Sequence, residues 1–436
     1  MQSLIENRAY RLKLYDFIQS QLNTADLDER QMALALIKFK DLSSLEVNLG
    51  FYALEEISKC LFERLVSITK NHDLVLQTSI DTFLLVVPKV LNHGHAKLVA
   101  NRISDEMKRK IQVEQDIIQL ESLIGIAISG DVSSGESLYK NALIAIEKGI
   151  LSDKNYALYE PVFSQQLKKN WDLKNAINIA LHENQFELYF QPKISLKENK
   201  VLGGEALIRW NHPQHGLVAP NDFIPVAEES GQIKAITDWV IKSSIRLLSS
   251  IIKSNPEFKL SINISANNLG TTELVIIIED MLLIWDVPAN NLILEITETA
   301  IIKDTKSTLH QLEIIRAKGV GVSIDDFGTG YSSLSYFKHL PVTEIKIDKS
   351  FIDNLLDDNQ DEKIIALIIS LAKQFELDVV AEGVENKATL EQLKVLGCDL
   401  AQGYYFSKPL PFDEFVDWNE NFVSVQEITS DKLLEK

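Results

Sequence analysis

The segment VSIDDFGTGYSSL, residues 322–334, places two adjacent aspartates at the end of an apolar, β-branched run and follows them with Gly-x-Gly. Such a run predicts a buried strand. Because side chains alternate between the two faces of a strand, neighbouring acids would point in opposite directions. Two adjacent carboxylates also repel each other, and burying either one without a partner is costly. The pair therefore indicates a functional site rather than a plain strand end.

Similar apolar runs alternate with helical segments from about residue 186 onward. This rhythm is typical of parallel β/α units. Eight such strands over roughly 240 residues have the size of an α/β domain built as a β/α (TIM-like) barrel. A doubly wound open sheet is the competing architecture, but its Gly-rich phosphate-binding turn is missing after the first strand. The predicted strands are residues 187–195, 203–210, 259–266, 291–299, 319–327, 343–351, 378–385 and 399–406.

The region before this one has a different texture, with little Pro or Gly up to about residue 160. Amphipathic helical segments such as residues 50–70 lie between short apolar runs, which predicts an α/β sandwich. Its expected strands are residues 32–39, 73–79, 82–88 and 122–129. The predicted organisation is a sandwich at 1–160, a connecting helix at 161–183, the barrel at 184–425 and a tail at 426–436.

Bulk composition excludes several functional classes. The 436 residues carry a net charge of −18, which argues against binding to duplex nucleic acid or to an anionic membrane. The N-terminus is charged where a signal peptide needs an apolar core, and the most apolar stretch, 274–285, is too short to span a bilayer. Two cysteines form no disulfide framework. We therefore expect a cytoplasmic protein.

Acids, amides and a lysine recur near the predicted strand ends. In a β/α barrel these ends converge on one mouth, where barrel enzymes keep their active sites. So many carboxylates require a counter-charge, and ligands that are all oxygen favour Mg²⁺ or Mn²⁺. Zinc is disfavoured because the eight histidines are absent from these positions, and His212 and His215 are expected on a surface loop. The residues are Glu205, Asn263, Glu295, Asp325, Asp326, Lys346, Asp348, Glu382 and Gln402.

The aspartate pair is now interpretable as part of a two-metal centre, because two such acids can each bind a different ion. Centres of this kind hydrolyse phosphodiesters or catalyse similar displacements. Lys346 would orient the nucleophile or neutralise phosphate charge, and Glu382 could ligate an ion or act as a base. The DFG triplet at 326–328 also occurs in protein kinases, but the other kinase motifs are missing.

The ordered motifs GGEALIRW, SINISA, LEITET, SIDDFGTGYSSL, EIKIDKSF, VVAEGVE and AQGYYFSKPL make residues 170–425 similar to the EAL family of bacterial phosphodiesterases. The resemblance implies two Mg²⁺ or Mn²⁺ ions, cyclic di-GMP as substrate, 5′-pGpG as product and a homodimer formed through the barrel. It makes Lys346 the catalytic lysine and Glu298 the residue that holds the mobile DFGTGYSS loop, with Glu385 nearby. The implied metal ligands are Glu205, Asn263, Glu295, Asp325, Asp326 and Glu382, and the implied substrate contacts are Gln191, Arg209, Asp348 and Gln402.

The first region resembles a GGDEF domain, the diguanylate cyclase fold, in a degenerate form. Where Gly-Gly-Asp-Glu-Phe is expected, residues 79–83 read SIDTF, and the glycines that would let the backbone approach GTP are missing. Lys38 and Lys40 flank the place of a metal-binding acid, and residues 70–73 keep only the acid of the Arg-x-x-Asp inhibitory site. We therefore expect this domain to be catalytically inactive and regulatory.

Two alternatives to a cyclic di-GMP phosphodiesterase stay open at this point. One is a receptor that binds cyclic di-GMP without turnover and signals to a protein partner. The other is a metal-dependent barrel that acts on a different phosphodiester. The complete set of acids argues against the receptor, and a substrate panel separates the second alternative.

Overall fold

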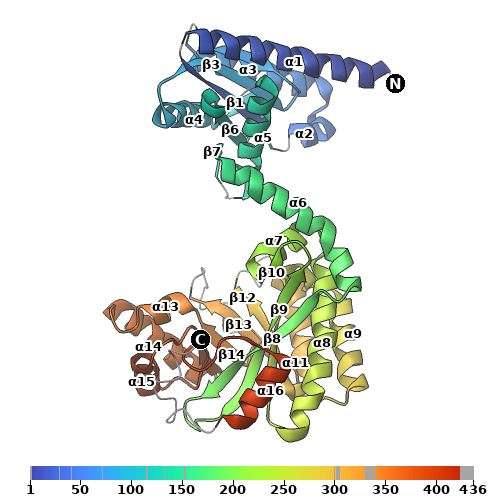
Figure 1. The fold of residues 1–436 in the computed structure, drawn as a ribbon, viewed down its shortest axis with the longest axis vertical. Coiled ribbons are helices and arrows are strands. Elements are labelled where there is room, and N and C mark those ends of the chain that lie inside the picture. Colours follow the sequence, from blue (N-terminus) through green and yellow to red (C-terminus); the bar gives the residue numbers. More distant parts are fainter. Residues whose placement is uncertain are drawn as a thin grey trace. The chain divides into compact units, whose positions relative to one another are not determined.

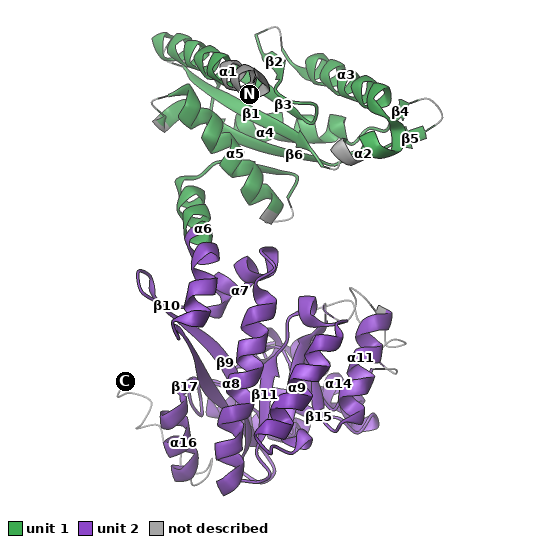
Figure 2. Ribbon diagram, turned by 90° about the vertical axis from the view of Figure 1, so that its right-hand side faces the viewer, with its two compact units in different colours: residues 1–171 green, residues 172–436 purple. Residues whose placement is uncertain are grey.

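A computed structural model of the chain describes residues 2–422, apart from residues 29, 41, 71, 114–115, 133, 152–153, 299, 301–304, 329–336 and 338–339. The chain divides into two compact units, residues 1–171 and 172–436, which we call the N-terminal and C-terminal units (Figure 2). Within the described residues, each helix is too short or too polar to cross a membrane. The tail expected at 426–436 lies outside the described residues.

The N-terminal unit is a sheet covered by helices on both faces. Its strand order is β2-β3-β1-β6-β7, and a separate hairpin pairs β4 with β5. The strands are β1 (Gln31–Phe39), β2 (Leu74–Gln77), β3 (Thr82–Val90), β4 (Ile111–Val113), β5 (Asp116–Ile118), β6 (Ser122–Ile128) and β7 (Tyr156–Leu158). The helices are α1 (Gln2–Leu27), α2 (Leu42–Leu49), α3 (Phe51–Ile68), α4 (His93–Met107) and α5 (Gly135–Leu151), and the 3-10 turn η1 (Ser129–Asp131) lies between β6 and α5.

Alternation along β1 explains why the sheet has a core on each face. Ala35 and Ile37 pack in one core with α3 and α4, whereas Leu34 and Leu36 pack in the other with α1 and α5. A strand buried on both faces reads as a continuous apolar run, as MALALIKF does. The expected α/β sandwich and its four strands are therefore present.

The C-terminal unit is a closed barrel (Figure 1). Its ring runs β9-β11-β12-β13-β14-β15-β16-β8, and β8 pairs with β9 to close it. The eight strands are β8 (Phe186–Ser195), β9 (Val201–His212), β11 (Lys259–Asn263), β12 (Leu292–Thr297), β13 (Gly321–Phe327), β14 (Glu344–Ile347), β15 (Asp378–Ala381) and β16 (Leu400–Ala401). Two short strands lie outside the ring: β10 (Gly216–Val218) pairs with β9, and β17 (Leu410–Pro411) pairs with β8. The predicted barrel is confirmed.

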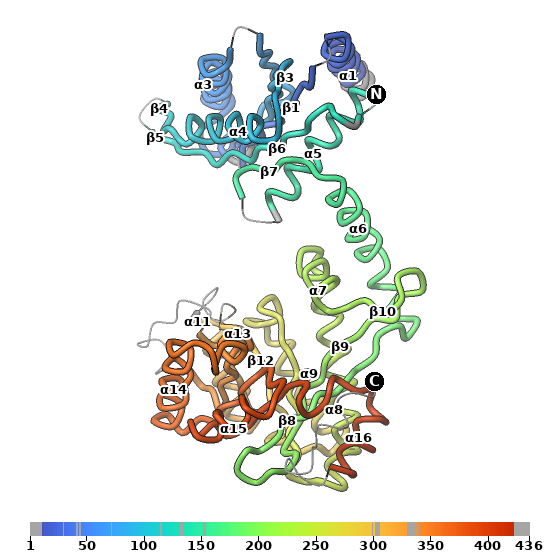
Figure 3. The backbone as a smooth tube through the Cα atoms, turned by 60° about the vertical axis from the view of Figure 1, so that its left-hand side comes forward, coloured from blue at the N-terminus to red at the C-terminus, as the bar shows by residue number. Residues whose placement is uncertain are grey.

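Helices surround this ring, as the tube in Figure 3 shows for the chain from β9 to α16. They are α6 (Pro161–His182), α7 (Pro220–Glu229), α8 (Ile233–Ser254), α9 (Thr272–Ile284), α11 (Thr305–Ala317), α13 (Lys349–Asp353), α14 (Asn359–Gln374), α15 (Lys387–Leu396) and α16 (Phe412–Asn421), with 3-10 turns η2 (Ala266–Asn268) and η3 (Ala289–Asn291). The division between the two units falls inside α6. Local signals set the helix ends: Asn386 caps α15 by accepting a hydrogen bond from the Thr389 N–H, and Gly397 ends it at φ 79°.

One expectation about the barrel is wrong, because its strands are not all parallel. β8 runs antiparallel to both neighbours, β9 and β16. Only residues 196–200 join β8 to β9, and a parallel pair would need a crossover of a dozen or more residues. A short connection therefore forces a hairpin. As a result, the middle of β8, and not its C-terminal end, lies beside the predicted site, with Gln191 opposite Glu205.

Candidate active site

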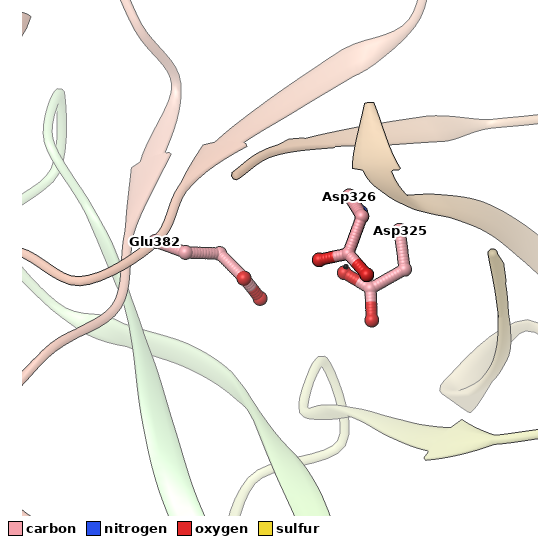
Figure 4. A group of neighbouring side chains, drawn as sticks. All are labelled: Asp325, Asp326 and Glu382. Carbon is pink, nitrogen blue, oxygen red and sulfur yellow. Dashed lines mark hydrogen bonds between the residues drawn. The ribbon is translucent and has the colours of Figure 1, made fainter. Parts of the chain in front are cut away.

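The backbone bulges where the two adjacent aspartates lie. Ile324 pairs with Ile345 and Phe327 pairs with Ile347, so Asp325 and Asp326 together oppose Lys346. Asp326 has a left-handed φ of 53°. A bulge with one extra residue interrupts the alternation of side chains. Both carboxylates therefore project into the same space, as Figure 4 shows.

Glu382 joins this pair from a different strand end. It follows β15 directly, and its carboxylate points towards the two aspartates (Figure 4). Single oxygen atoms of Asp325, Asp326 and Glu382 all lie within 4.8 Å of one another. Three half-buried carboxylates at this spacing repel one another, so the cluster favours a cation.

Lys346 lies at the centre of a group of carboxylates that come from the neighbouring strands and strand ends. Its side chain is 1% exposed, and its ammonium contacts four acids from four strands or strand ends. The Nζ–oxygen distances are 2.6 Å to Glu295, 2.6 Å to Glu382, 3.1 Å to Asp325 and 3.4 Å to Glu205. Residues separated by up to 177 positions thus become neighbours, from Glu205 to Glu382.

Glu205 is held by two amide side chains. Asn263 Nδ2 donates to its Oε1 at 2.7 Å, and Gln402 Nε2 donates to its Oε2 at 2.7 Å. Gln402 also donates to Oε1 of Gln191 at 3.0 Å. Glu205 lies in the middle of β9 and not near its end, because β9 continues past the ring to pair with β10. The expectation that Glu205 lies near the end of its strand is therefore wrong.

Burial and mutual repulsion shift the pKa values of the acids. Burial, then Asp325 and Asp348, raise the pKa of Asp326 to about 6. Burial raises the pKa of Glu382 to about 8, against the opposing effect of Lys346. Burial also acts to raise the pKa of Glu295, but Lys193 and Lys346 outweigh it and lower that pKa to about 2. Burial alone would lower the pKa of Lys346, yet the surrounding carboxylates raise it well above its usual value.

A cavity of about 730 Å³ opens beside this cluster. It is lined by Asn263 of the site and by Arg209 and Tyr404. The guanidinium of Arg209 lies 5.5 Å from the centre of the Tyr189 ring, and Arg209 is half-buried. A volume of this size accommodates a ligand as large as a dinucleotide.

Comparison with known proteins now identifies the domains. The model of the EAL domain family matches residues 174–409, which is more than half of the chain. The chain belongs to the EAL family. The model described as the diguanylate cyclase GGDEF domain matches residues 5–155, within the N-terminal unit.

Two curated relatives come from Pseudomonas aeruginosa. The bifunctional diguanylate cyclase/cyclic di-GMP phosphodiesterase MucR is 32% identical over 416 residues, which are 93% of this chain and 60% of MucR. The cyclic di-GMP phosphodiesterase NbdA is 33% identical over 401 residues, 91% of this chain and 51% of NbdA. The chain thus spans about half to three fifths of the length of these relatives.

A solved structure is similar to the EAL domain. The PaMucR phosphodiesterase in complex with cyclic di-GMP is 40% identical, with a TM-score of 0.54, and the match covers 56% of this chain and 99% of that one. The fold and the order of domains predicted from the motifs are therefore confirmed.

The EAL domain brings some predicted residues to the cluster and leaves others at its edge. Asp348 caps α13 by accepting a hydrogen bond from the Ser350 N–H at 3.0 Å, which is the structural role that an acid after a strand most often has. Glu385 is exposed and pairs with Lys349 at 2.5 Å. His212, expected on a surface loop, is instead buried at the end of β9, where its Nδ1 accepts backbone N–H groups of the following turn.

Glu298 lies under the turn that follows the aspartates. It is 4% exposed, and its Oε2 accepts a hydrogen bond from the Gly328 N–H at 3.3 Å. Gly328 has φ 101°, a conformation that favours glycine. Most of the loop predicted to move, including Gly330, lies outside the described residues.

Sequence reasoning missed Lys193 and Glu344. Lys193 lies within β8, and its ammonium contacts Glu295 at 2.8 Å and Glu344 at 2.9 Å. A signal was available in FELYFQPKIS, because a lysine inside an apolar strand is almost never buried unless it is paired. Its partners come from distant strands and could not be read from the local pattern.

The donor set of the EAL domain fits divalent cations. Asp325, Asp326 and Glu382 offer carboxylate oxygens, and the Asn263 amide that donates to Glu205 retains a carbonyl oxygen for a cation. Within the described part of the chain, Oε1 of Gln402 is a buried acceptor without a hydrogen-bond partner. A buried oxygen in that state suits a cation or a water bound to one.

Proposed function

We propose that this chain hydrolyses cyclic di-GMP to linear 5′-pGpG with the help of two Mg²⁺ or Mn²⁺ ions. The observation that carries the proposal is the convergence of Asp325, Asp326 and Glu382 beside Lys346, in a domain similar to a phosphodiesterase solved with cyclic di-GMP. Water adds to one phosphorus, and the bond between that phosphorus and O3′ breaks. The product therefore keeps a 5′-phosphate.

The proposed metal ligands are those named from the motifs, namely Glu205, Asn263, Glu295, Asp325, Asp326 and Glu382. When bound, the ions would supply a hydroxide nucleophile and stabilise the leaving alkoxide. Lys346 balances the carboxylate charge and orients the water, and Glu382 ligates an ion or accepts a proton.

Substrate contacts are assigned to residues at the rim of the cluster. Arg209 lines the cavity and carries a positive charge that suits a phosphate. Gln191 and Gln402 are joined by a hydrogen bond within reach of Glu205, and Asp348 lies beside Asp326. We propose that these four residues bind the dinucleotide, and that the protein forms a homodimer through its barrel.

The proposal for the GGDEF domain is that it makes no cyclic di-GMP. In the turn between β2 and β3, Asp81 is occupied by hydrogen bonds from Ser79 and Thr82, and the described residues of this turn have no left-handed backbone. Lys40 is paired with Glu121 at 3.0 Å. This arrangement offers neither a glycine hairpin for GTP nor a carboxylate pair for Mg²⁺.

The test of the phosphodiesterase is a product assay on the full chain. Incubation of cyclic di-GMP with Mg²⁺ or Mn²⁺ should give 5′-pGpG, and a chelator should abolish it. Ca²⁺ should bind and inhibit, because its longer and looser coordination disturbs a two-ion geometry. Binding of cyclic di-GMP without product in either metal would favour the receptor, and preference for another diester in a substrate panel would favour a different hydrolase.

The test of the GGDEF domain is incubation with GTP and Mg²⁺ under conditions that block the phosphodiesterase, using Glu205→Gln. We expect no cyclic di-GMP by mass spectrometry. Synthesis above the background of a no-enzyme control would show that the domain is an active cyclase.

A further inference from the structure

Lys193 is a buried lysine outside the residues assigned above. It lies on the antiparallel strand β8, and its side chain is 4% exposed. Its Nζ donates to Ser261 Oγ at 2.7 Å, to Glu295 Oε1 at 2.8 Å and to Glu344 Oε1 at 2.9 Å. An ammonium buried to this degree is retained only with such partners.

Glu295 is held by two lysines from opposite sides. Its Oε1 accepts from Lys193, whereas its Oε2 accepts from Lys346 at 2.6 Å. Each oxygen of this carboxylate therefore accepts from a different ammonium group and keeps a second lone pair for another partner. The rotation of the Glu295 carboxylate is fixed by Lys193 at one end and by the predicted metal site at the other.

The two lysines neutralise different sets of buried acids, which share only Glu295. Lys346 contacts Glu205, Asp325 and Glu382 as well as Glu295, while Lys193 contacts Glu344 as well as Glu295. Without Lys193, Oε1 of Glu295 would lose its ammonium partner, and Lys346 would be left to balance that carboxylate.

We propose that Lys193 is a positioning residue of the metal centre. It holds Oε1 of Glu295 by a hydrogen bond. This contact keeps Oε2 of Glu295 and the ammonium of Lys346 in their positions at the proposed metal site. This inference rests on the proposed function for its effect on turnover, but its effect on metal binding can be measured without turnover.

A competing role for Lys193 is simple neutralisation of Glu344 during folding. Lys193→Met alone does not separate the two roles, because it leaves Glu344 buried and unpaired, which destabilises a protein strongly. The informative comparison is Glu344→Leu against the double variant Lys193→Met/Glu344→Leu. Both lack the Glu344 charge, and they differ in whether Oε1 of Glu295 and Oγ of Ser261 keep the Lys193 ammonium as a partner.

The measurements are Mn²⁺ affinity by calorimetry, kcat and KM for cyclic di-GMP, and the thermal midpoint. We expect the double variant to fold and to lose about 10–100-fold in Mn²⁺ affinity and in kcat relative to Glu344→Leu, which is typical for loss of a group that orients a ligand. KM should change little, because Lys193 does not line the cavity beside Arg209. Lys200→Met is the matched control: its ammonium also contacts two acids, at 2.8 and 3.3 Å, but its side chain is 48% exposed.

Equal Mn²⁺ affinity and kcat in Glu344→Leu and the double variant would overturn the proposal and leave Lys193 with a folding role. The proposal would also fail if Lys200→Met lost as much as the double variant. If the unaltered chain hydrolyses no cyclic di-GMP while the double variant still loses Mn²⁺ affinity, the proposed function fails and the role of Lys193 stands.

Discussion

Asp326 shows how the backbone of one residue can bring two adjacent carboxylates together. Its left-handed backbone, at φ 53°, turns the second carboxylate of the pair back to the side of the first. This conformation costs an L-residue about 1–2 kcal/mol, and Asp and Asn are the residues other than Gly that occasionally adopt it. An aspartate therefore suits this position for conformational as well as chemical reasons.

The variant Asp326→Asn separates these two reasons. We expect it to fold with a near-normal thermal midpoint, because Asn accepts the same backbone angles. It should lose at least about 100-fold in kcat/KM, beyond the usual effect of a group that only supports a ligand. Kinetics and circular dichroism, with the exposed Asp357→Asn as control, test this expectation. Normal kinetics in Asp326→Asn would remove Asp326 from the ligand set.

The raised pKa values of Asp326 and Glu382 predict that metal binding releases protons. With a pKa of about 8, Glu382 holds its proton near neutral pH when no cation is present, whereas Asp326, with a pKa of about 6, is protonated mainly below that value. A divalent ion displaces those protons, so apparent affinity should rise with pH between about 6 and 8 and level off above that range. Calorimetry of Mn²⁺ binding in buffers of different ionisation enthalpy measures the release. An affinity independent of pH would contradict the raised pKa values of these two carboxyl groups.

At the scale of elements, periodicity located the barrel strands, because each is a short apolar run between helical segments. It could not give the direction of β8, which depends on the short connection at 196–200 rather than on any pattern within the strand. Lys193 was missed for a related reason: its partners Ser261, Glu295 and Glu344 come from β11, β12 and β14. Asp348 fitted the site pattern, and the structure shows that it lies beside Asp326 and also caps α13.

Glu298 connects the end of β12 with the turn after β13. It accepts a hydrogen bond from the Gly328 N–H, two residues beyond Asp326, and the adjoining loop begins there. Gly328 cannot easily be replaced by another residue, because its φ is 101° and an added Cβ would lie 3.1 Å from the Phe351 ring. Glu298 is thus well placed to fix the backbone conformation of the turn that follows Asp326.

For Glu298→Ala we expect a loss of about 10–100-fold in metal affinity or activity, as for other groups that orient ligands. Glu298→Gln keeps an oxygen acceptor for the Gly328 N–H and should recover most of that loss. The comparison needs kcat, KM and Mn²⁺ affinity for both variants. Near-normal values for Glu298→Ala would mean that the residue belongs to a plain turn.

At the scale of the whole molecule, the chain carries a GGDEF domain in which residues 79–83 read SIDTF. The EAL domain does not need it for its own core, which is built from residues between Leu173 and Phe415. A single helix, α6, begins in one unit and ends in the other. In the C-terminal unit, Leu173, Ile177 and Ala180 of this helix are buried in the barrel core. We interpret the N-terminal domain as a regulator that acts through α6.

Deleting residues 1–160 tests that interpretation, because the cut keeps all of α6 and its buried residues. A regulatory domain must favour one state of the barrel over another, commonly by about 1–3 kcal/mol, so the deletion should change kcat/KM by about five-fold or more. Mn²⁺ affinity and the thermal midpoint of the remaining barrel show whether the site itself is intact, and light scattering reports the oligomeric state of both proteins. The alternative is a folded remnant that merely shields the barrel. It predicts unchanged kinetics and an unchanged oligomeric state, and that result would exclude regulation through α6.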